Sequence, residues 1–455
     1  MAVAVAAAAA GCGEDSGSGV ETVASGDAFA EPTGLAFRPG GEGELWVTNH
    51  GDDSVAIVDD SGEEATVTNR RDAYAEHFVA RPDGIAFDDT GEYLAIANDS
   101  NNEVRDMEFV MNPERNRFFK NNNFMGPTLF DADTYALAGQ SKGYLDDWPQ
   151  PGFGHDPPDD IPRHQCPDEY WSEEAAQCIW PREGSHLDML HSSPLAAGIA
   201  HAGDNLYYVL DGCGGRTPAN RCEGNGHVVL IDFNRDHQEG NGFHGDGIVE
   251  RFIDAPFTRT EGVPSGIAVH DGSVYYADTG AGVVRRLDPE GGTREIVVHP
   301  WHPGPATHHQ QGNGLMDWAD AAHGPADGDD PNAVDEWIAT HGDARMIEEL
   351  GDEWIKPQET LGEYSYVLDA AGEEAIPSGE IERPAGLAAS DETLYAADNA
   401  TGDVHAFDWD DLSTPDEVYE TGAESLGGLA LDPADEDWLY FTDTAGNSVG
   451  RVAID

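Results

Sequence analysis

The sequence predicts an all-β fold, a six-bladed β-propeller, from three observations. A strand that begins Gly-[Leu/Ile]-Ala, followed by an apolar strand ending in Asp or Asn, occurs six times along the chain. The copies are short β-branched and aromatic runs bounded by Gly, Asp and Asn, which is typical of strands. The chain also contains 54 glycines and 27 prolines, as expected of a turn-rich all-β protein.

Each copy has two recurring features, an opening glycine and an Asp or Asn at the end of the second strand, and each has a physical explanation. The copies open at Gly34, Gly84, Gly198, Gly266, Gly386 and Gly428, and their second strands end at Asn49, Asn98, Asp211, Asp278, Asp398 and Asp443. Innermost strands crowd around a propeller axis, where a residue without a side chain permits close approach. The Asp and Asn side chains suit turns because they bond nearby backbone N–H groups, so we interpret them as structural rather than ligand-binding.

The repeated segments resemble the NHL repeat family, whose propellers usually have six four-stranded blades. The resemblance implies an outer fourth strand in every blade, and four segments are candidates for it: residues 65–68, 247–252, 294–298 and 417–420. The last copy has none after it. We therefore predict that residues 20–24 complete the last blade, which joins the ends of the ring and removes an exposed edge.

Two intervals between opening glycines are too long for one blade: 114 residues from Gly84 to Gly198 and 120 from Gly266 to Gly386. Each interval holds either a degenerate blade or an insertion. No repeat phrase occurs in them, which favours insertions at about 108–191 and 299–382. The second is partly helical by its pattern from Asp330. Long loops on a rigid scaffold often carry function, although their tryptophans and histidines also suit a structural lid.

The charge balance is extreme, with 88 acidic residues against 23 Lys and Arg and a formal net charge of −65. Nucleic acid and anionic lipid surfaces are poor partners for such a field. Salt near 1 M shortens the Debye length to about 3 Å and screens the self-repulsion. The composition indicates a salt-adapted, halophilic or marine protein, or alternatively an acidic secreted one.

Residues 1–19 have the pattern of a signal peptide followed by a flexible tether. A short apolar run ends in small residues before Cys12, as in a bacterial lipoprotein in which this cysteine is lipidated; an ordinary secretory signal is the alternative. The expected localisation is extracytoplasmic, anchored to the cell envelope by lipid or secreted. Residues 20–455 then form one propeller domain that meets the membrane only through the N-terminal anchor.

The four remaining cysteines form two local pairs in the sequence. Cys166 lies near Cys178, and Cys213 lies near Cys222. In an oxidising compartment the simple interpretation is two local disulfides. A zinc site built from all four is the alternative, although the tight C-x-x-C spacing is missing.

One short stretch has the residues of a metal site. His186, Asp188 and His191 supply nitrogen and carboxylate ligands, and His244 and Asp246 could assist. Such ligands suit a divalent metal such as Zn²⁺, and the alternative is that these are hydrogen-bonded loop histidines. The many oxygen-rich loops separately suit Ca²⁺. Some propellers that resemble NHL proteins are lyases that hold zinc at the axis through histidines.

That histidine set does not carry over to this chain. His201 and His270 end their first strands, away from the face where the blade-joining loops meet, and His50 is better placed but alone. We therefore expect a monomeric binding module for an unknown protein or small-molecule ligand. The alternative is a metal-dependent lyase or hydrolase at the insertion-covered face, and a purely structural surface protein is the third hypothesis.

Overall fold

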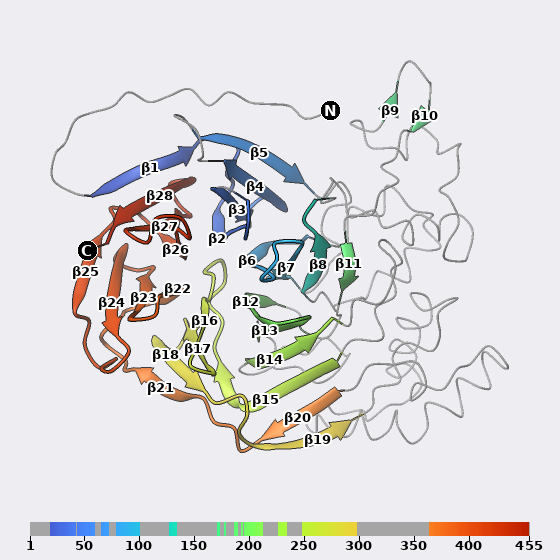
Figure 1. Cartoon of the computed structure of the whole chain (residues 1–455), viewed down its shortest axis with the longest axis vertical. Coiled ribbons are helices and arrows are strands. Elements are labelled where there is room, and N and C mark those ends of the chain that lie inside the picture. Colours follow the sequence, from blue (N-terminus) through green and yellow to red (C-terminus); the bar gives the residue numbers. More distant parts are fainter. Residues whose placement is uncertain are drawn as a thin grey trace.

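Six β-sheets are arranged around a common axis, each with its first strand innermost (Figure 1). The computed structural model describes residues 19–41, 43–59, 65–71, 79–100, 127–133, 171–172, 177–178, 186–189, 193, 195–212, 226–233, 248–297 and 364–454. Each innermost strand contacts the innermost strands of both neighbouring sheets, and the last contacts the first. The six repeats therefore close a ring of six blades, as the sequence predicts, and neither long interval adds a seventh blade to it.

Blade 1 consists of β2 (Pro32–Phe37), β3 (Glu44–Asn49), β4 (Ser54–Asp59) and β5 (Thr66–Arg71). Blade 2 consists of β6 (Pro82–Phe87), β7 (Tyr93–Asn98), β8 (Thr128–Asp131) and β11 (His186–Met189). Blade 3 begins with β12 (Ala196–Gly203), β13 (Leu206–Asp211), β14 (Gly226–Asp232) and β15 (Ile248–Phe257). Blade 4 consists of β16 (Ile267–His270), β17 (Ser273–Asp278), β18 (Val283–Leu287) and β21 (Glu373–Ile376).

Blade 5 consists of β22 (Pro384–Ala389), β23 (Thr393–Asp398), β24 (Asp403–Asp408) and β25 (Glu417–Glu420). Blade 6 consists of β26 (Leu426–Leu431), β27 (Trp438–Asp443), β28 (Ser448–Ala453) and β1 (Val20–Ser25). A separate two-stranded sheet pairs β9 (Trp171–Ser172) with β10 (Gln177–Cys178). The predicted fourth strands of blades 1, 3 and 5 are confirmed as β5, β15 and β25.

The ring is closed by its N-terminal strand, as predicted. β1 pairs antiparallel with β28, with Val20 opposite Val452 and Ser25 opposite Ser448. Arg451 of β28 extends across this seam, and its Nη2 lies 2.6 Å from Oε2 of Glu21. The first and last strands of the fold are thereby joined in one sheet, and the edge of β28 is covered.

The prediction for the fourth strand of blade 4 was wrong. Residues 294–297 of the predicted segment fall in β19 (Thr293–Val297), which pairs with β20 (Tyr364–Leu368) rather than with β18; residue 298 lies outside the described residues. β20 in turn pairs in parallel with β15, so both strands extend blade 3 to six strands. The fourth strand of blade 4 is β21, with Ile376 opposite Val284. Alternating side chains specify a strand but not its neighbour, and the partner here comes from distant sequence.

Strands of the ring lie inside both predicted insertions. β8 and β11 fall within 108–191, and β20 and β21 fall within 299–382. Long connections thus interrupt blades instead of following complete ones. The helical pattern predicted from Asp330 lies outside the described residues. Within the described part of the chain, no helix has the length and apolarity that crossing a membrane requires.

The opening glycines stand where neighbouring inner strands meet. A Cβ on Gly386 would lie 2.6 Å from the carbonyl oxygen of Gly427 and 2.6 Å from the backbone nitrogen of Leu429 in blade 6. A Cβ on Gly428 would lie 2.8 Å from the carbonyl oxygen of Thr33 in blade 1. Real Cβ atoms do not approach backbone so closely, so the inner ring requires glycine there, as the sequence argument expected.

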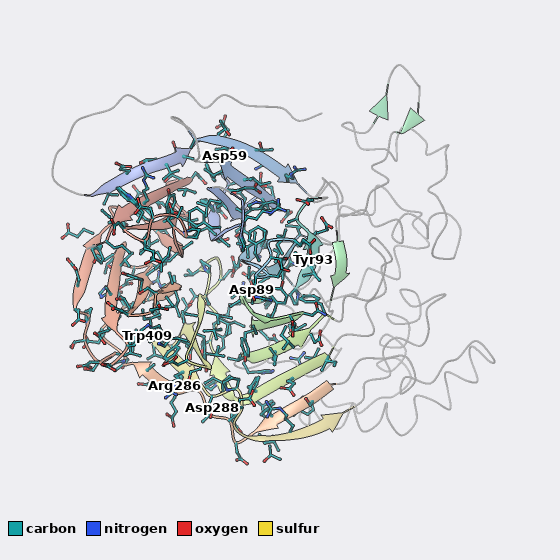
Figure 2. All side chains as sticks on the ribbon, in the orientation of Figure 1. Asp59, Asp89, Tyr93, Arg286, Asp288 and Trp409 are labelled. Atoms are coloured by element: carbon teal, nitrogen blue, oxygen red, sulfur yellow. The ribbon has the colours of Figure 1, made fainter. Side chains whose placement is uncertain are left out.

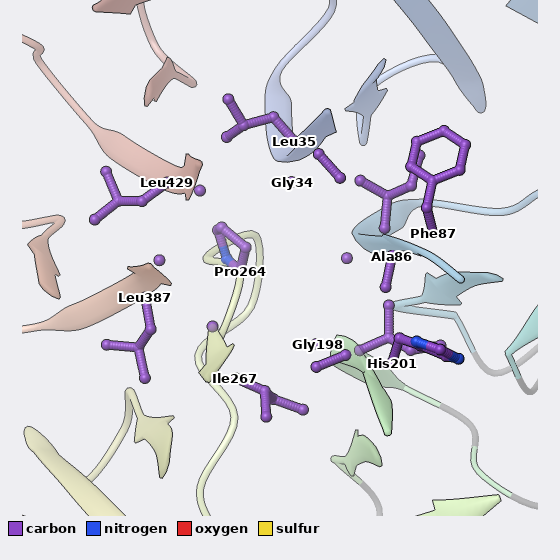
Figure 3. Close-up of a pocket in the computed structure, with 18 of the residues that line it drawn as sticks. Gly34, Leu35, Ala86, Phe87, Gly198, His201, Pro264, Ile267, Leu387 and Leu429 are labelled. Atoms are coloured by element: carbon purple, nitrogen blue, oxygen red, sulfur yellow. The ribbon is translucent and has the colours of Figure 1, made fainter. Parts of the chain in front are cut away.

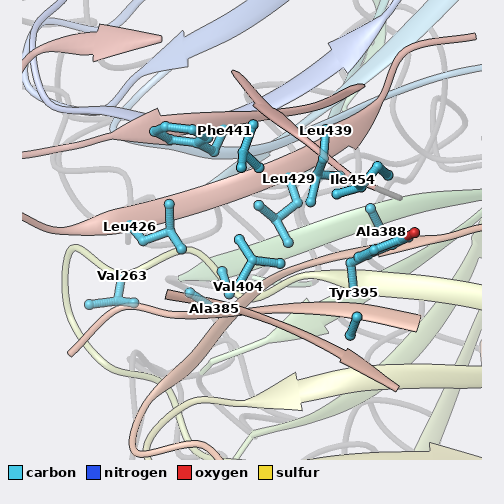
Figure 4. Packing of buried hydrophobic residues seen from close by; sticks show 13 residues of the cluster. Val263, Ala385, Ala388, Tyr395, Val404, Leu426, Leu429, Leu439, Phe441 and Ile454 are labelled. Carbon is cyan, nitrogen blue, oxygen red and sulfur yellow. The ribbon is translucent and has the colours of Figure 1, made fainter. Parts of the chain in front are cut away.

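Apolar side chains fill the spaces between blades. Between blades 5 and 6, Val404, Leu426, Leu439 and Phe441 are buried in one cluster (Figure 4). Burying an aliphatic or aromatic side chain of this size contributes about 1.5–3 kcal/mol, so blade-to-blade packing stabilises the ring. Figure 2 shows the described side chains on all six blades.

Asn98, Asp278 and Asp398, which end second strands, accept hydrogen bonds from backbone N–H groups, as predicted for these positions. Asn98 Oδ1 accepts a hydrogen bond from the backbone N–H of Ala80 at 3.0 Å, and Asp278 Oδ1 accepts one from Thr258 at 2.7 Å. Asp398 likewise accepts bonds from the backbone of Glu382 and Arg383. These side chains hold the segment entering their own blade, which satisfies backbone donors that would otherwise be unpaired.

Candidate functional site

Three ionisable side chains converge at one end of the central channel, the space around the propeller axis that the six innermost strands enclose. His50 directly follows β3 in blade 1, Asp99 directly follows β7 in blade 2, and Asp83 is the second residue of β6. Second strands end, and first strands begin, at the same face of this propeller, so residues at these positions in adjacent blades are neighbours. One ligand atom from each of the three lies within 4.8 Å of the others.

His50 is held at both ring nitrogens. Its Nδ1 lies 2.8 Å from Asp83 Oδ1, and Arg81 Nε donates to its Nε2 at 3.1 Å. Because arginine only donates, a neutral His50 must accept at Nε2 and donate from Nδ1 to Asp83. Burial lowers the pKa of His50, but the hydrogen bond to Asp83 and the charges of Asp83 and Asp99 outweigh it, so this pKa is raised.

Asp99 is buried against a guanidinium. Both carboxylate oxygens accept hydrogen bonds from Arg259, with Arg259 Nη2 lying 2.5 Å from Oδ2. Burial and the neighbouring charge of Asp83 nevertheless raise the pKa of Asp99 to about 6, against the opposing effect of Arg259. The site therefore places the charge of Asp83 close enough to Asp99 to disfavour the ionisation of Asp99.

Arg81 connects the cluster to solvent. Its side chain is 45% exposed, and its Nη2 lies 3.2 Å from Oε1 of Glu261. Its backbone has a φ of 47°, uncommon for a residue with a side chain, and its N–H is fixed by Asp53 Oδ1 at 2.8 Å. The turn of blade 1 thus fixes the residue that covers His50.

One polar atom of the cluster has no partner among the described residues. Asp83 has none of its surface exposed, and its Oδ2 is buried without a hydrogen-bond partner. Its other oxygen, Oδ1, lies 2.8 Å from Nδ1 of His50 and is hydrogen-bonded to it. A buried carboxylate oxygen left unpaired is costly, so this atom marks the position at which a donor or a cation would be most stabilising.

The loop of residues 258–266, here the channel loop, joins this cluster to the opposite side of the ring. It carries Arg259 and Glu261 beside blade 2, and its Val263 packs in the buried cluster between blades 5 and 6. Ser265 donates its N–H to the carbonyl of Ala197, and Gly266 donates to that of Ala385. Figure 3 shows Pro264 of this loop in the middle of the channel.

Beside the channel loop lies a cavity of about 360 Å³, lined by the first strands of all six blades (Figure 3). Its wall combines aliphatic side chains, among them Leu35, Leu387 and Leu429, with polar backbone and side-chain atoms. Asp83 lines the end near the cluster, and Asp89 and His201 line the end away from it. The cavity therefore runs along the axis between the two faces.

The sequence-based metal set and this cluster are different residues. His186 and Asp188 lie on β11, the outer strand of blade 2, and their side chains fall outside the described part of the structure. His191, His244 and Asp246 lie outside the described residues, as do the side chains of Cys12, Cys166, Cys178, Cys213 and Cys222. The metal, lipidation and disulfide assignments stay predictions.

His50 was correctly expected on the face where the blade-joining loops meet, but its partners were missed. The signal lay in departures from the repeat. At the position before the opening glycine, blade 2 has Asp83, whereas other blades have Thr33, Ser265 and Ala385. At the position after the second strand, blades 1 and 2 have His50 and Asp99, whereas the other blades have Gly212, Thr279, Asn399 and Thr444. Ionisable residues replace small or neutral ones at matching positions in two adjacent blades, which the structure brings together.

The donor set fits a divalent cation. An imidazole nitrogen and two carboxylates are ligands of Zn²⁺ and related ions, and the unpaired Asp83 oxygen offers a free lone pair. Two guanidinium groups already use lone pairs of the same cluster, so cation and arginine compete for them. The chemistry available is therefore cation binding balanced by Arg81 and Arg259.

A scan of the chain against protein-family models gives no match, and a search of curated proteins gives none. Among solved structures, it is similar to the β-propeller domain of Cps50 (Swd1) from Myceliophteria thermophila, with 9% identity over 96% of this chain and 100% of that chain, at a TM-score of 0.41.

It is also similar to virginiamycin B lyase from Staphylococcus aureus, with 10% identity over 96% and 99% of the two chains and a TM-score of 0.40. Regucalcin, a calcium-binding protein from Agrobacterium tumefaciens, gives 10% identity over 94% and 90% and a TM-score of 0.40. Similarity this distant carries no argument about function.

Proposed function

We propose that this protein is a ligand-binding propeller that holds a divalent cation at His50, Asp83 and Asp99. The observation that carries the proposal is Asp83 Oδ2, which is buried within this cluster and has no hydrogen-bond partner among the described residues. A cation there would stabilise the ionised form of Asp99, which burial now disfavours. A cation that displaces Arg81 from Nε2 of His50 would gain an imidazole ligand. Zn²⁺ or a similar transition ion therefore suits the site better than Ca²⁺, which prefers oxygen.

The arrangement of the site favours ligand binding over catalysis in which side chains alone act as acid and base. Both ring nitrogens of His50 are engaged, one by Asp83 and one by Arg81. A general base needs a nitrogen or oxygen that reaches the substrate proton. His50 does not offer one in this arrangement, so recognition through the cation and the half-exposed Arg81 is the better-supported function.

Export and lipid anchoring at Cys12 complete the proposal, with the propeller displayed outside the cytoplasm. It is supported by the apolar run and small residues before Cys12. Expression of the Cys12→Ser variant in a bacterial host tests the anchor. Loss of membrane association together with loss of lipid labelling supports it; unchanged membrane association contradicts it.

The metal content of purified protein tests the cation proposal. Protein would be purified in high salt without chelator and its bound ions measured by plasma mass spectrometry. Wild type should retain about one divalent ion per chain, while Asp83→Ser, which introduces the residue that blade 4 has at this position, should lose it.

The matched control is Asn399→Thr, which changes the corresponding position to His50 and Asp99 in blade 5, far from the cluster in the ring. It should retain the ion. Metal-free wild type that also fails to take up Zn²⁺ on dialysis would contradict the proposal. An ion lost equally from both variants would indicate a site elsewhere.

A further inference from the structure

The axial cavity ends in solvent on the face opposite the proposed cation site. Its lining there includes Phe37, Phe87 and Asp89 at the ends of β2 and β6. The Asp89 side chain is 87% exposed, so the cavity reaches water at this rim. The other end is crossed by the channel loop, with Pro264 in the middle (Figure 3). The cavity therefore opens at the Asp89 rim and is crossed by the channel loop at its other end.

A ring of aliphatic side chains forms the wall. Every blade contributes the residue that follows its opening glycine: Leu35, Ile85, Ile199, Ile267, Leu387 and Leu429. A volume of about 360 Å³ lies within the range of small-molecule sites, which are mostly apolar with a few polar groups that orient the ligand. The aliphatic part of the wall thus suits the apolar body of a small molecule, and its polar part can orient the ligand.

The ionisable groups at the pocket are three carboxylates and one imidazole. These residues are Asp83, Asp88, Asp89 and His201, and neither lysine nor arginine lines the pocket among the described residues. Asp88 is buried and accepts hydrogen bonds within its own turn, from Thr90 and from the backbone of Tyr93. Asp89 is the exposed carboxylate at the mouth (labelled near the ring centre in Figure 2).

His201 leaves the Asp89 carboxylate accessible. Its Nε2 donates to the carbonyl of Asp204 at 3.1 Å, and its Nδ1 lies 3.3 Å from Asp89 Oδ1. The ring thereby flanks one oxygen of Asp89 at the rim of the apolar chamber. An ammonium group placed beside Asp89 would keep its charge in water while its apolar chain entered the ring of aliphatic residues.

We propose that this pocket binds a small organic cation, an amine with an apolar body, that enters by the Asp89 face. The inference stands on the cavity, its aliphatic ring and its acidic mouth, and it does not depend on the cation site at His50. The chain's net charge of −65 adds a field that attracts such ligands.

Binding of 4-phenylbutylamine and of 4-phenylbutanol, measured by calorimetry in about 0.15 M salt, tests the proposal. The two probes share an apolar body and differ in charge. We expect one saturable site per chain that prefers the amine by about 2–5-fold, which is what an exposed ion pair contributes. No saturable binding, or an alcohol that binds as tightly as the amine, would overturn it.

Two variants locate the site. Asp89→Asn should remove the preference for the amine, whereas Asp271→Asn should not; Asp271 is 96% exposed beside His270, as Asp89 is beside His201, but it does not line the cavity. Ile267→Phe, at a partly exposed position of the aliphatic ring, should weaken both probes by at least about tenfold by filling the pocket.

Thermal unfolding of Ile267→Phe shows whether it folds as wild type does. If it does and both probes still bind unchanged, the probes bind elsewhere and the proposal fails. Adding a metal chelator should change neither probe's affinity, so a failed cation proposal would leave this result intact. Equal effects of Asp89→Asn and Asp271→Asn would indicate attraction to the surface at large, which also overturns the proposal.

Discussion

Arg259 donates hydrogen bonds to both carboxylate oxygens of Asp99, a residue 160 positions earlier in the chain. This pair ties the channel loop between blades 3 and 4 to the end of β7 in blade 2. Asp99 is completely buried, and the Arg259 side chain is only 17% exposed. The pair therefore holds one end of the channel loop beside His50 and Asp83.

The Arg259 pair should matter for stability far more than the Arg81 pair. Removing one partner of a buried ion pair leaves the other charge unpaired, so Arg259→Gln should cost roughly 3 kcal/mol in urea unfolding at pH 7. Arg81→Gln removes a pair that is 45% exposed on Arg81 and 70% on Glu261, and should cost less than about 1 kcal/mol.

The cost of Arg259→Gln should also depend on pH in chelator-treated protein. The pKa of Asp99 in the folded protein is raised to about 6, above its unfolded value, and loss of Arg259 removes an effect that lowers it. A folded-state pKa above the unfolded value means that this group's stabilisation is lost as pH rises through the folded pKa. The penalty should therefore shrink at pH 5. An equal penalty at both pH values would contradict this electrostatic account.

Removal of β1 should destabilise the ring. Five residue pairs join β1 to β28, and at about 0.2–1 kcal/mol each they contribute roughly 1–5 kcal/mol. Deletion of residues 1–25 should lower the urea midpoint accordingly, whereas deletion of residues 1–18 leaves β1 intact and should not. Equal midpoints for the two truncations would show that the closing strand does not support the ring.

The inner ring should reject a methyl group. Gly386→Ala places a Cβ 2.6 Å from two backbone atoms of blade 6, so it should cost about 1–3 kcal/mol, as overpacking does. Gly291→Ala is the control, because its Cβ would meet atoms no nearer than 3.3 Å. Circular dichroism during thermal unfolding measures both, and an undisturbed Gly386→Ala would refute the close-approach explanation of the repeat.

Salt should stabilise the fold. Raising KCl from about 0.1 M to 1 M shortens the Debye length from about 10 Å to 3 Å. The repulsion carried by a net charge of −65 falls accordingly, so the melting temperature should rise across this range. The composition-based hypothesis of a salt-adapted protein fails if the melting temperature is unchanged or falls.

The fold could be predicted from the sequence because each blade repeats the same local signals. The repeat itself specifies which segments contact the opening glycines, the Asp and Asn strand ends and the closing strand. The outer pairing of blade 3 could not, because β19 and β20 join an edge through a long connection whose destination no local pattern encodes.

The candidate site was missed for a related reason. His50, Asp83 and Asp99 are separated by 33 and 16 positions, and each looks ordinary within its own blade. Only alignment of the six copies shows that ionisable side chains replace Ser, Thr, Ala or Gly, and only the ring shows that those positions meet. The three side chains meet only because blades 1 and 2 are neighbours in the ring, and this neighbourhood is a property of the tertiary structure.

Zn²⁺ titration of chelator-treated protein by calorimetry tests directly whether a cation binds at Asp83. Wild type should bind one equivalent, Asn399→Thr should match it, and Asp83→Ser should bind at least about tenfold more weakly, as the loss of a ligand requires. Equal affinities for wild type and Asp83→Ser, or no binding by folded wild type, would contradict cation binding there.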